Sequence, residues 1–320
     1  MGTSNQGILK TIFKTKELGI FLVCLILSII VEIMNPIFFT YNNMMDIFRN
    51  TSYTLIIAVG MTFVLIARGL DLSVGSVFAY GGLIAAYTMS LGCPIPIAVL
   101  AGILTGCVCG LVNAFCIVKL KVAPMIATLG SMYMVRGLVL VLTKGQPIFP
   151  LPEAFSGFGK LKIVGIPVII IVALLISIAA HIVLTRTTYG RAVYAVGGNP
   201  ETAKYAGINI KWITASCYII SSCLAATAGI LNAARMGSGQ PTVGDGTEMT
   251  VITAVIIGGV SLNGGAGSIL GTVLGTLLMN ILSTGMNLVG VSAYWQKFVM
   301  GMIIVFAVAF DQYQRSKKKA

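Results

Sequence analysis

Only a few charged side chains lie inside apolar stretches of this sequence, and they are the first candidates for chemistry. Arg68 and Asp71 stand three residues apart between two apolar segments, and Arg136 lies within another. An unpaired charge at the centre of a membrane span costs about 2.5–3.5 kcal/mol on insertion scales. Arg68 and Asp71 therefore either line an aqueous pathway or gate, or form a pair in which Asp71 caps a helix; the second interpretation is favoured. For Arg136, pairing or snorkelling is favoured over contact with a solute.

Uncharged polar residues inside apolar stretches form a second set, namely Asn113, Thr128, Asn232 and Asn280. Each could hydrogen-bond to a neighbouring helix, which is the default in lipid, or line a hydrated route for a hydroxylated solute. The sequence has no nucleophile-and-base arrangement, no zinc signature and no Gly-x-x-x-x-Gly-Lys-[Ser/Thr] phosphate loop. We therefore expect no enzymatic activity, no metal and no cofactor.

The composition indicates which elements must hold these side chains. Of the 320 residues, 57% are hydrophobic and 9% are charged, whereas soluble domains carry about 25% charged residues. So little charge cannot cover a protein surface in water, and lipid must be the solvent for most of this one. The mean hydropathy of +0.96 agrees. The excess of 21 basic over nine acidic residues reflects membrane topology and not nucleic-acid binding, because no basic patch is interleaved with aromatic residues.

The apolar runs predict an all-α, polytopic membrane bundle that forms a single domain over residues 1–320. Ten candidate spans lie near residues 18–36, 52–67, 71–90, 95–118, 123–143, 164–184, 213–234, 248–260, 267–290 and 294–311. Several are shorter than a bilayer requires. The second and third are separated only by residues 68–71, and the eighth and ninth by a glycine-rich turn at 258–265. We expect these breaks to face a cavity.

The basic residues indicate which side each loop faces. With the N-terminus in the cytoplasm, 14 of the 21 basic residues fall on the cytoplasmic side, which favours a topology with both termini inside. Eight spans would place the termini in the same way, so eight and ten both remain open. Glycines recur every four residues at Gly102, Gly106 and Gly110, and again at Gly271 and Gly275, which favours close packing of helices.

The longest polar stretch after the N-terminus, residues 185–212, contains a complete specification for a short helix. Asn199 suits the N-cap, Pro200 the first helical position and Glu201 the first turn, and Gly207 suits the end of the helix. A helix of about two turns is too short to be stable in isolation. We therefore expect it to lie in a cytoplasmic loop and to dock against another protein; an ordinary capped helix at the membrane surface is the alternative.

Four stretches spread over most of the chain resemble the permease subunit of bacterial ATP-binding-cassette importers of the ribose, galactoside and autoinducer-2 type. They are residues 60–75 (GMTFVLIARGLDLSVG), 124–137 (PMIATLGSMYMVRG), 190–208, which end in VGGNPETAKYAGI, and 256–275 (IIGGVSLNGGAGSILGTVLG). In the third stretch, Glu201, Ala203 and Gly207 keep the Glu-x-Ala-x-x-x-Gly spacing of the loop that such permeases present to their ATPase. Thr202 replaces the usual second small residue, and Arg68 stands where relatives often have glycine.

The resemblance implies a division of labour among several chains. A separate cytoplasmic ATPase would bind the loop helix, and an extracellular or periplasmic solute-binding protein would deliver the substrate. Two permease chains, identical or not, would enclose the path across the bacterial inner membrane. We expect alternating access to move a small hydroxylated solute such as a monosaccharide. The resemblance leaves the particular solute open.

Two acidic residues on the predicted outer side, Asp245 and Glu248, could contact the external binding protein by charge complementarity; a solvated loop and helix cap is the favoured alternative. A rival function is a secondary transporter or channel that works alone. Such proteins need buried acids or unwound ion sites, for which Glu32, Asp71 and the glycine-rich breaks are available. Dependence of uptake on ATP discriminates between the two functions.

Overall fold

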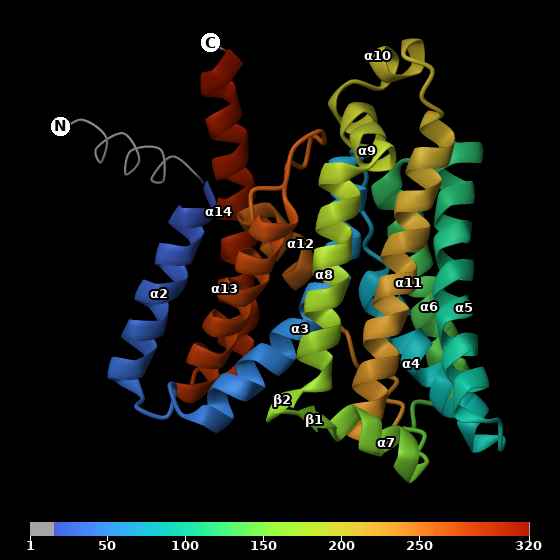
Figure 1. Ribbon diagram of the computed structural model, residues 1–320, viewed down its shortest axis with the longest axis vertical. Helices are drawn as coiled ribbons and strands as arrows, with labels where there is room; N and C mark the ends of the chain where they lie inside the picture. The colour runs from blue at the N-terminus through green and yellow to red at the C-terminus, as the bar shows by residue number, and fades with distance from the viewer. Residues whose placement is uncertain (1–15, 320) are drawn as a thin grey trace.

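The computed structural model describes residues 16–319, which form a helical bundle with one small hairpin (Figure 1). The helices are α2 (Lys16–Met34), α3 (Tyr41–Ile66), α4 (Val74–Ser90), α5 (Ile95–Ala114), α6 (Pro124–Thr143), α7 (Glu153–Lys160), α8 (Val168–Arg186), α9 (Thr188–Gly198), α10 (Pro200–Tyr205), α11 (Ile210–Met236), α12 (Thr247–Ile257), α13 (Ile269–Leu288) and α14 (Ala293–Lys319). A π-helical turn, η1 (Phe115–Lys119), continues α5. The hairpin pairs β1 (Lys162–Ile163) with β2 (Ile166–Pro167) in antiparallel fashion. The all-α polytopic class is confirmed.

Seven of the described helices are long and apolar enough to cross a membrane, namely α2, α3, α5, α6, α8, α11 and α13. The apolar parts of α4, α12 and α14 are shorter. Large apolar side chains such as Ile126, Val141 and Phe306 are exposed on the outside of the bundle, as expected where lipid is the solvent. The number of crossings and the side of the membrane that each end faces stay predictions.

The predicted glycine packing is present at the centre of the bundle, where α11 lies against α3, α4 and α5. A Cβ added to Gly106 of α5 would lie 2.6 Å from the carbonyl oxygen of Ser222 in α11. The backbone at Gly271 and Gly275 of α13 likewise touches carbonyl oxygens of the α12 segment. Since helices in lipid gain little from apolar contact with each other, this backbone-level approach supplies the van der Waals attraction between them.

Several polar elements were missed or misplaced by reading apolar runs. Helix α3 begins at Tyr41 and not near residue 52, because its first turns are polar and a hydropathy window excludes them. Helix α9 precedes the predicted loop helix, and α7 with the β1–β2 hairpin joins α6 to α8. These elements carry too little apolar sequence to register as spans.

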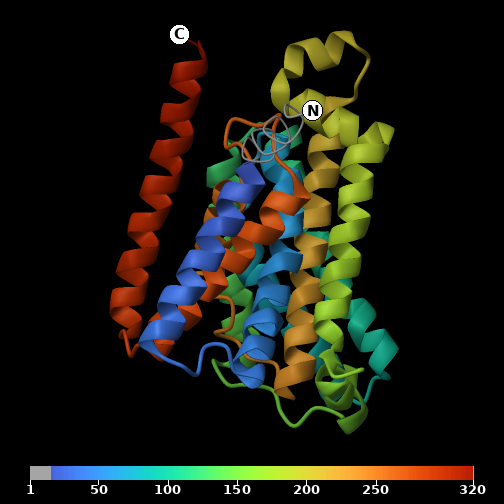
Figure 2. The same cartoon turned by 60° about the vertical axis from the view of Figure 1, so that its left-hand side comes forward.

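The two described ends of the chain lie at the same end of the bundle. In Figures 1 and 2 the beginning of α2, the end of α14 and the helices α9 and α10 gather at one end. Helix α7 and the hairpin lie at the other. An even number of crossings would give this arrangement. Lys10 and Lys14, two of the basic residues on which the predicted orientation rests, lie outside the described residues.

Candidate coupling site and buried polar cluster

The loop helix predicted at Asn199 is present as α10, with the expected cap. The side-chain oxygen of Asn199 accepts hydrogen bonds from the backbone amides of Glu201 at 3.0 Å and Thr202 at 3.1 Å. Pro200 occupies the start of the helix, where its missing N–H costs nothing. Gly207 follows the helix with a φ of +78°, a backbone conformation that glycine adopts without strain.

Helix α10 projects from the end of the bundle and is covered by little else (Figure 2). Ala203 is 3% exposed and is its buried residue, whereas Glu201 and Lys204 are exposed. Tyr205 at the end of the helix is 91% exposed. A six-residue helix that presents a large aromatic ring to water has the features of a docking surface.

Helix α9 fixes the base of α10 to the bundle through two tyrosines. The Tyr189 hydroxyl lies 2.7 Å from that of Ser216, and its ring meets Trp212 edge-on at 6.3 Å. The Tyr194 hydroxyl donates to the carbonyl of Gly267 at 2.8 Å. Burial raises the pKa of both tyrosines above the ordinary value, so both phenols keep their protons at neutral pH and their hydrogen bonds persist.

Asp71 lies at 0% exposure in a cluster of polar side chains between α3 and α4. One carboxylate oxygen accepts from the amide of Ser73 at 3.0 Å and from its hydroxyl at 2.6 Å, and the other accepts from Ser221 at 3.0 Å. The side-chain amide of Asn113 donates to the Ser73 hydroxyl at 2.9 Å. The structure therefore brings Asp71 and Asn113 together. Asp71 stabilises the turn before α4 but does not cap the helix itself, whose N-cap residue is Ser73 and has no side-chain cap hydrogen bond.

The predicted pair between Arg68 and Asp71 is wrong. Arg68 is exposed, Asp71 is fully buried, and in the part of the chain that the structure describes the ion pairs are Asp46 with Arg49 and Asp46 with Arg235. Arg68 also has a φ of +66°, in the left-handed region. That conformation turns the chain sharply after α3, and it directs the two side chains to different environments.

Arg136 pairs with the backbone of another element, as favoured from the sequence. Its guanidinium donates to the carbonyl oxygens of Pro241 and Val243, both at 3.0 Å. These residues lie in the connection between α11 and α12. Arg136 therefore holds this irregular segment against α6, and its charge-assisted hydrogen bonds lower the cost of placing a cation within the bundle.

The two acidic residues considered for external contact differ in accessibility. Asp245 is exposed, whereas Glu248 is 8% exposed and its carboxylate fills the space beside Gly75 of α4. A Cβ on Gly75 would collide with that carboxylate and lie 2.5 Å from the carbonyl oxygen of Gly244. A docking partner could reach Asp245 but not Glu248 in this conformation.

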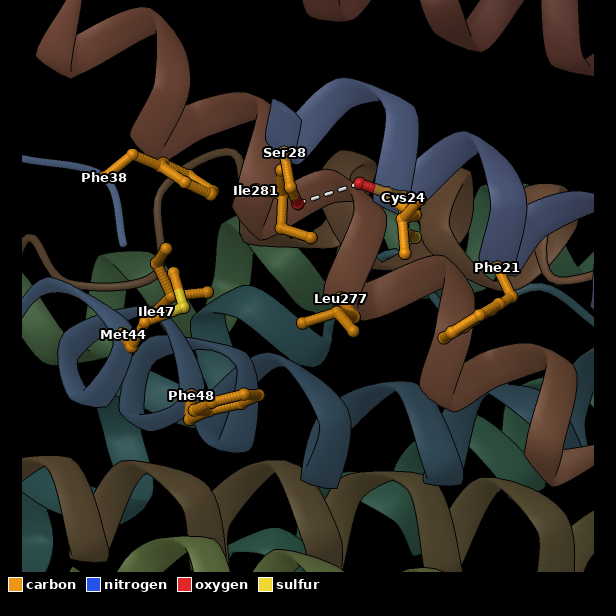
Figure 3. A pocket seen from close by; sticks show the side chains of 10 residues that line it. Phe21, Cys24, Ser28, Phe38, Met44, Ile47, Phe48, Leu277 and Ile281 are labelled. Carbon is orange, nitrogen blue, oxygen red and sulfur yellow. Dashed lines mark hydrogen bonds between the residues drawn. The ribbon is translucent and has the colours of Figure 1, made fainter. Parts of the chain in front are cut away.

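The hollows between the helices are largely apolar. The one in Figure 3, about 160 Å³, lies between α2, α3 and α13, and its lining includes Phe21, Phe38 and Leu277. Its one hydroxyl, on Ser28, donates to the carbonyl of Cys24 in the same helix. A hollow of about 340 Å³ between α3, α8 and α13 has a similar lining. Neither offers the convergent polar groups that a sugar requires.

A basic hollow of about 260 Å³ lies at the end of the bundle opposite α10. Arg49, Lys160, Lys162 and Arg235 contribute to its lining, and Asp46 pairs with both arginines. Four positive charges facing one acid leave a net positive surface. No pattern along the chain predicts this hollow, because its members come from α3, α7, β1 and α11.

Sequence reasoning also missed Tyr218 and Ser221, which complete the cluster around Asp71. The Tyr218 hydroxyl accepts from the amide of Leu70 at 3.2 Å and lies 3.3 Å from the carbonyl oxygen of the same residue. The available signal is weak: a tyrosine and three serines within an apolar helix. Other tyrosines and serines in apolar helices look the same in the sequence. Tyr218 and Ser221 differ from them only because α11 packs against the α3–α4 connection.

Among the side chains that the structure describes, no group of three or more His, Cys, Asp or Glu residues is arranged to hold a metal ion. Comparison with known families then decides the class of protein. The sequence matches the family described as branched-chain amino acid transport system, permease component, over residues 43–308. The chain belongs to this family. Its members are non-catalytic membrane subunits of ATP-binding-cassette transporters in which a separate chain carries the ATPase.

Several curated permeases are similar to the chain over nearly its whole length. The ribose import permease protein of Haemophilus influenzae is 39% identical over 302 residues, covering 93% of this chain and 94% of the relative. The corresponding protein of Bacillus subtilis is 40% identical over 299 residues, covering 93% of each. The D-allose transport system permease protein of Escherichia coli is 35% identical, covering 91% and 90%. No solved structure matches the chain. The permease is an integral protein of the bacterial inner membrane.

Proposed function

We propose that the permease is the membrane subunit of an ATP-driven importer and that α10 is the surface on which its cytoplasmic ATPase docks. The single observation that carries the docking site is the capped, exposed helix with Tyr205 at its end. ATP-driven closure of the ATPase pushes α10, and the bundle converts from outward-facing to inward-facing. Asn199, Pro200 and Gly207 set the bounds of the helix, Glu201 faces the partner, and Ala203 seats the helix on the bundle.

The proposed solute is a monosaccharide. Relatives named for ribose, allose and L-arabinose transport match most of the chain, whereas the family description refers to branched-chain amino acids. A hydroxylated solute needs a route lined by polar groups, and the two apolar hollows described above do not supply one. We therefore place the route between two permease chains, with an external binding protein supplying most of the selectivity.

For the external side we propose that the binding protein docks at the end opposite α10. The basic hollow at Arg49 and Arg235 lies at that end and would attract acidic side chains. Asp245 follows Gly244, which packs against Gly75 at the start of α4, so it lies deeper in the bundle than this surface. Complementary charges of this kind mainly raise the rate of association and weaken as salt increases. Faster association of binding protein at low salt, lost in an Arg49→Ala and Lys162→Ala double variant, would support this surface.

The docking site is tested by substituting α10 in the complete transporter reconstituted with its ATPase and binding protein. Tyr205→Ala should weaken ATPase binding about thirtyfold, the result of removing an interface anchor worth about 2 kcal/mol. Glu201→Arg should act in the same direction. Lys119→Ala at the end of η1 removes another exposed charge and serves as the control. ATPase co-purification and ATP-dependent uptake are the measurements; full binding and uptake in both α10 variants would refute the docking site.

The rival function is a secondary transporter or channel that works without an ATPase. Its best ion site would be Asp71, but both carboxylate oxygens already accept hydrogen bonds from Ser73 and Ser221 within the fold. An ion would have to displace these bonds. Uptake into vesicles by the permease alone, driven by a sodium or proton gradient and insensitive to ATP, would establish the rival.

A further inference from the structure

Three segments that are distant in the sequence meet at the last turn of α9. The amide of Gly265, in the connection between α12 and α13, donates to the carbonyl of Ile66 at 2.8 Å. A Cβ added to Gly197 would fall on that same carbonyl oxygen and lie 2.7 Å from the Gly265 amide nitrogen. The end of α3, the end of α9 and the glycine-rich connection are therefore in direct backbone contact. We call Ile66, Gly197, Gly264 and Gly265 the Gly197 junction.

The contact is tight from the other side as well. A Cβ on Gly264 would lie 2.7 Å from the carbonyl oxygen of Gly197, and one on Gly265 would lie 2.7 Å from the Cα of Gly198. A contact made by side chains can yield through a change of rotamer, whereas backbone against backbone has no such freedom. A displacement of α9 toward these segments must therefore push the end of α3 and the glycine-rich connection.

The junction is joined directly to the proposed docking helix. Only Asn199 separates α9 from α10. The hydrogen bond from Tyr194 to the carbonyl of Gly267 gives α9 a second attachment to the glycine-rich connection. A push on α10 thus reaches the junction through one short, capped turn.

Beyond the junction lies the α3–α4 connection, residues 67–73, which bears Asp71. Tyr218 and Ser221 of α11 hold this connection through Leu70 and Asp71, and α11 is the helix that follows α10 in the chain. The helices on both sides of the docking helix, α9 and α11, therefore contact the end of α3 or the α3–α4 connection that follows it. Irregular segments within a bundle are the places where helices can change direction at low cost.

We propose that the Gly197 junction transmits the movement of α10 to the α3–α4 connection and to the glycine-rich connection, with Gly197 as the positioning residue. The proposal rests on the docking of the ATPase at α10. It adds a second, separable requirement. An ATPase that binds and hydrolyses ATP drives transport only if α9 keeps both its backbone contact with Ile66 and Gly265 and its hydrogen bond from Tyr194 to Gly267.

The test compares Gly197→Ala with Gly198→Ala in the reconstituted transporter. The two glycines are neighbours at the end of α9, but a Cβ on Gly198 meets nothing within 4 Å, so Gly198→Ala is a matched control. The readouts are insertion, ATPase co-purification, ATP hydrolysis and solute transported per ATP hydrolysed. In Gly197→Ala the ATPase should still bind and hydrolyse ATP, while solute transported per ATP falls about tenfold. In Gly198→Ala the ratio should be unchanged.

An equal ratio in the two alanine variants and the unmodified transporter would overturn the proposal. Should Gly197→Ala fail to insert, Tyr194→Phe decides, because it removes one hydroxyl and leaves the packing intact. A lowered ratio in Tyr194→Phe supports the junction, and an unchanged ratio overturns it. Failure of the proposed function has a different signature: the unmodified transporter would show no ATP-driven uptake, or would keep it when Tyr205 and Glu201 are substituted.

Discussion

At the scale of single residues, the two charged groups Asp71 and Arg136 are tolerated inside the bundle because each has several hydrogen-bond partners. Asp71 carries three hydrogen bonds from Ser73 and Ser221, and Arg136 reaches two carbonyl oxygens. Charge-assisted hydrogen bonds are about twice as strong as neutral ones, which offsets part of the cost of removing the charge from water. The irregular connections of the bundle depend on these bonds for their conformation.

Asp71→Ala should therefore destabilise the permease. Removing the carboxylate leaves the Ser73 amide and two buried hydroxyls without their acceptor, at a cost of about 1–3 kcal/mol. The midpoint of thermal unfolding in detergent measures it, with the exposed Asp245→Ala as control. An unchanged midpoint together with abolished uptake would instead assign Asp71 to the pathway.

Arg68→Gly should have the opposite effect. A non-glycine residue at a φ of +66° carries about 1–2 kcal/mol of strain. The greater freedom of glycine in the unfolded chain offsets about 0.5–1 kcal/mol of this, so a net gain of up to about 1.5 kcal/mol is expected. Arg191→Gly, at an exposed helical position of α9, should lose about 1 kcal/mol and is the comparison. A lower unfolding midpoint for Arg68→Gly would show that the arginine side chain makes a stabilising contact.

At the scale of elements, glycines set how closely the helices approach. The α5–α11 contact has almost no side chain between the backbones at Gly106 and Gly110, whereas Gly130 and Gly137 of α6 face open space. The same residue type thus has different roles on neighbouring helices. The spacing of glycines along the sequence indicates that a helix packs closely against another helix, but it does not indicate which helix that is.

Gly106→Ala should separate α5 from α11 and destabilise the permease by about 1–3 kcal/mol, the usual cost of overfilling a packed interior. Gly130→Ala, with nothing within 4 Å of the added Cβ, should be neutral or stabilise by about 0.5–1 kcal/mol. Thermal unfolding of the two variants side by side checks this. Equal losses would mean that the face of α6 at Gly130 is also covered in the assembled transporter.

At the scale of the whole molecule, the arrangement separates an end that carries α9 and α10 from an end that carries α7 and the hairpin. The excess of basic residues predicts that the first end faces the cytoplasm. The docking of an ATPase requires the same orientation. Two independent considerations, charge and partner, therefore agree on a topology that labelling can test.

A cysteine at Lys204 on α10 and one at Val164 in the hairpin turn, which is 95% exposed, should be modified from opposite sides of the membrane. The background is the chain with its seven cysteines replaced. We expect a membrane-impermeant maleimide added to intact cells to label the Val164→Cys variant and, only after permeabilisation, the Lys204→Cys variant. Labelling of both from outside would overturn the predicted topology.

Much of the fold follows from the sequence because hydropathy and helix caps act locally. Apolar runs located most of the long helices, and Asn199, Pro200 and Gly207 specified α10 with its cap. Polar elements such as α7 and α9 were missed, since a helix held by tertiary contacts leaves no apolar run. For the candidate site, the capped helix α10 was predictable, whereas the partners of Asp71 were not.

By itself the sequence determined the solvent of this protein, its class of fold and the place where we propose that a partner docks, since composition and capping depend on residues close together in the chain. Only the tertiary structure decided that Arg68 and Asp71 do not pair and that α11 supplies Tyr218 and Ser221 to the cluster around Asp71. It also decided that Gly197 touches Ile66 and Gly265. Those contacts join residues far apart in the sequence, and they depend on how several helices pack together. No local pattern encodes that packing.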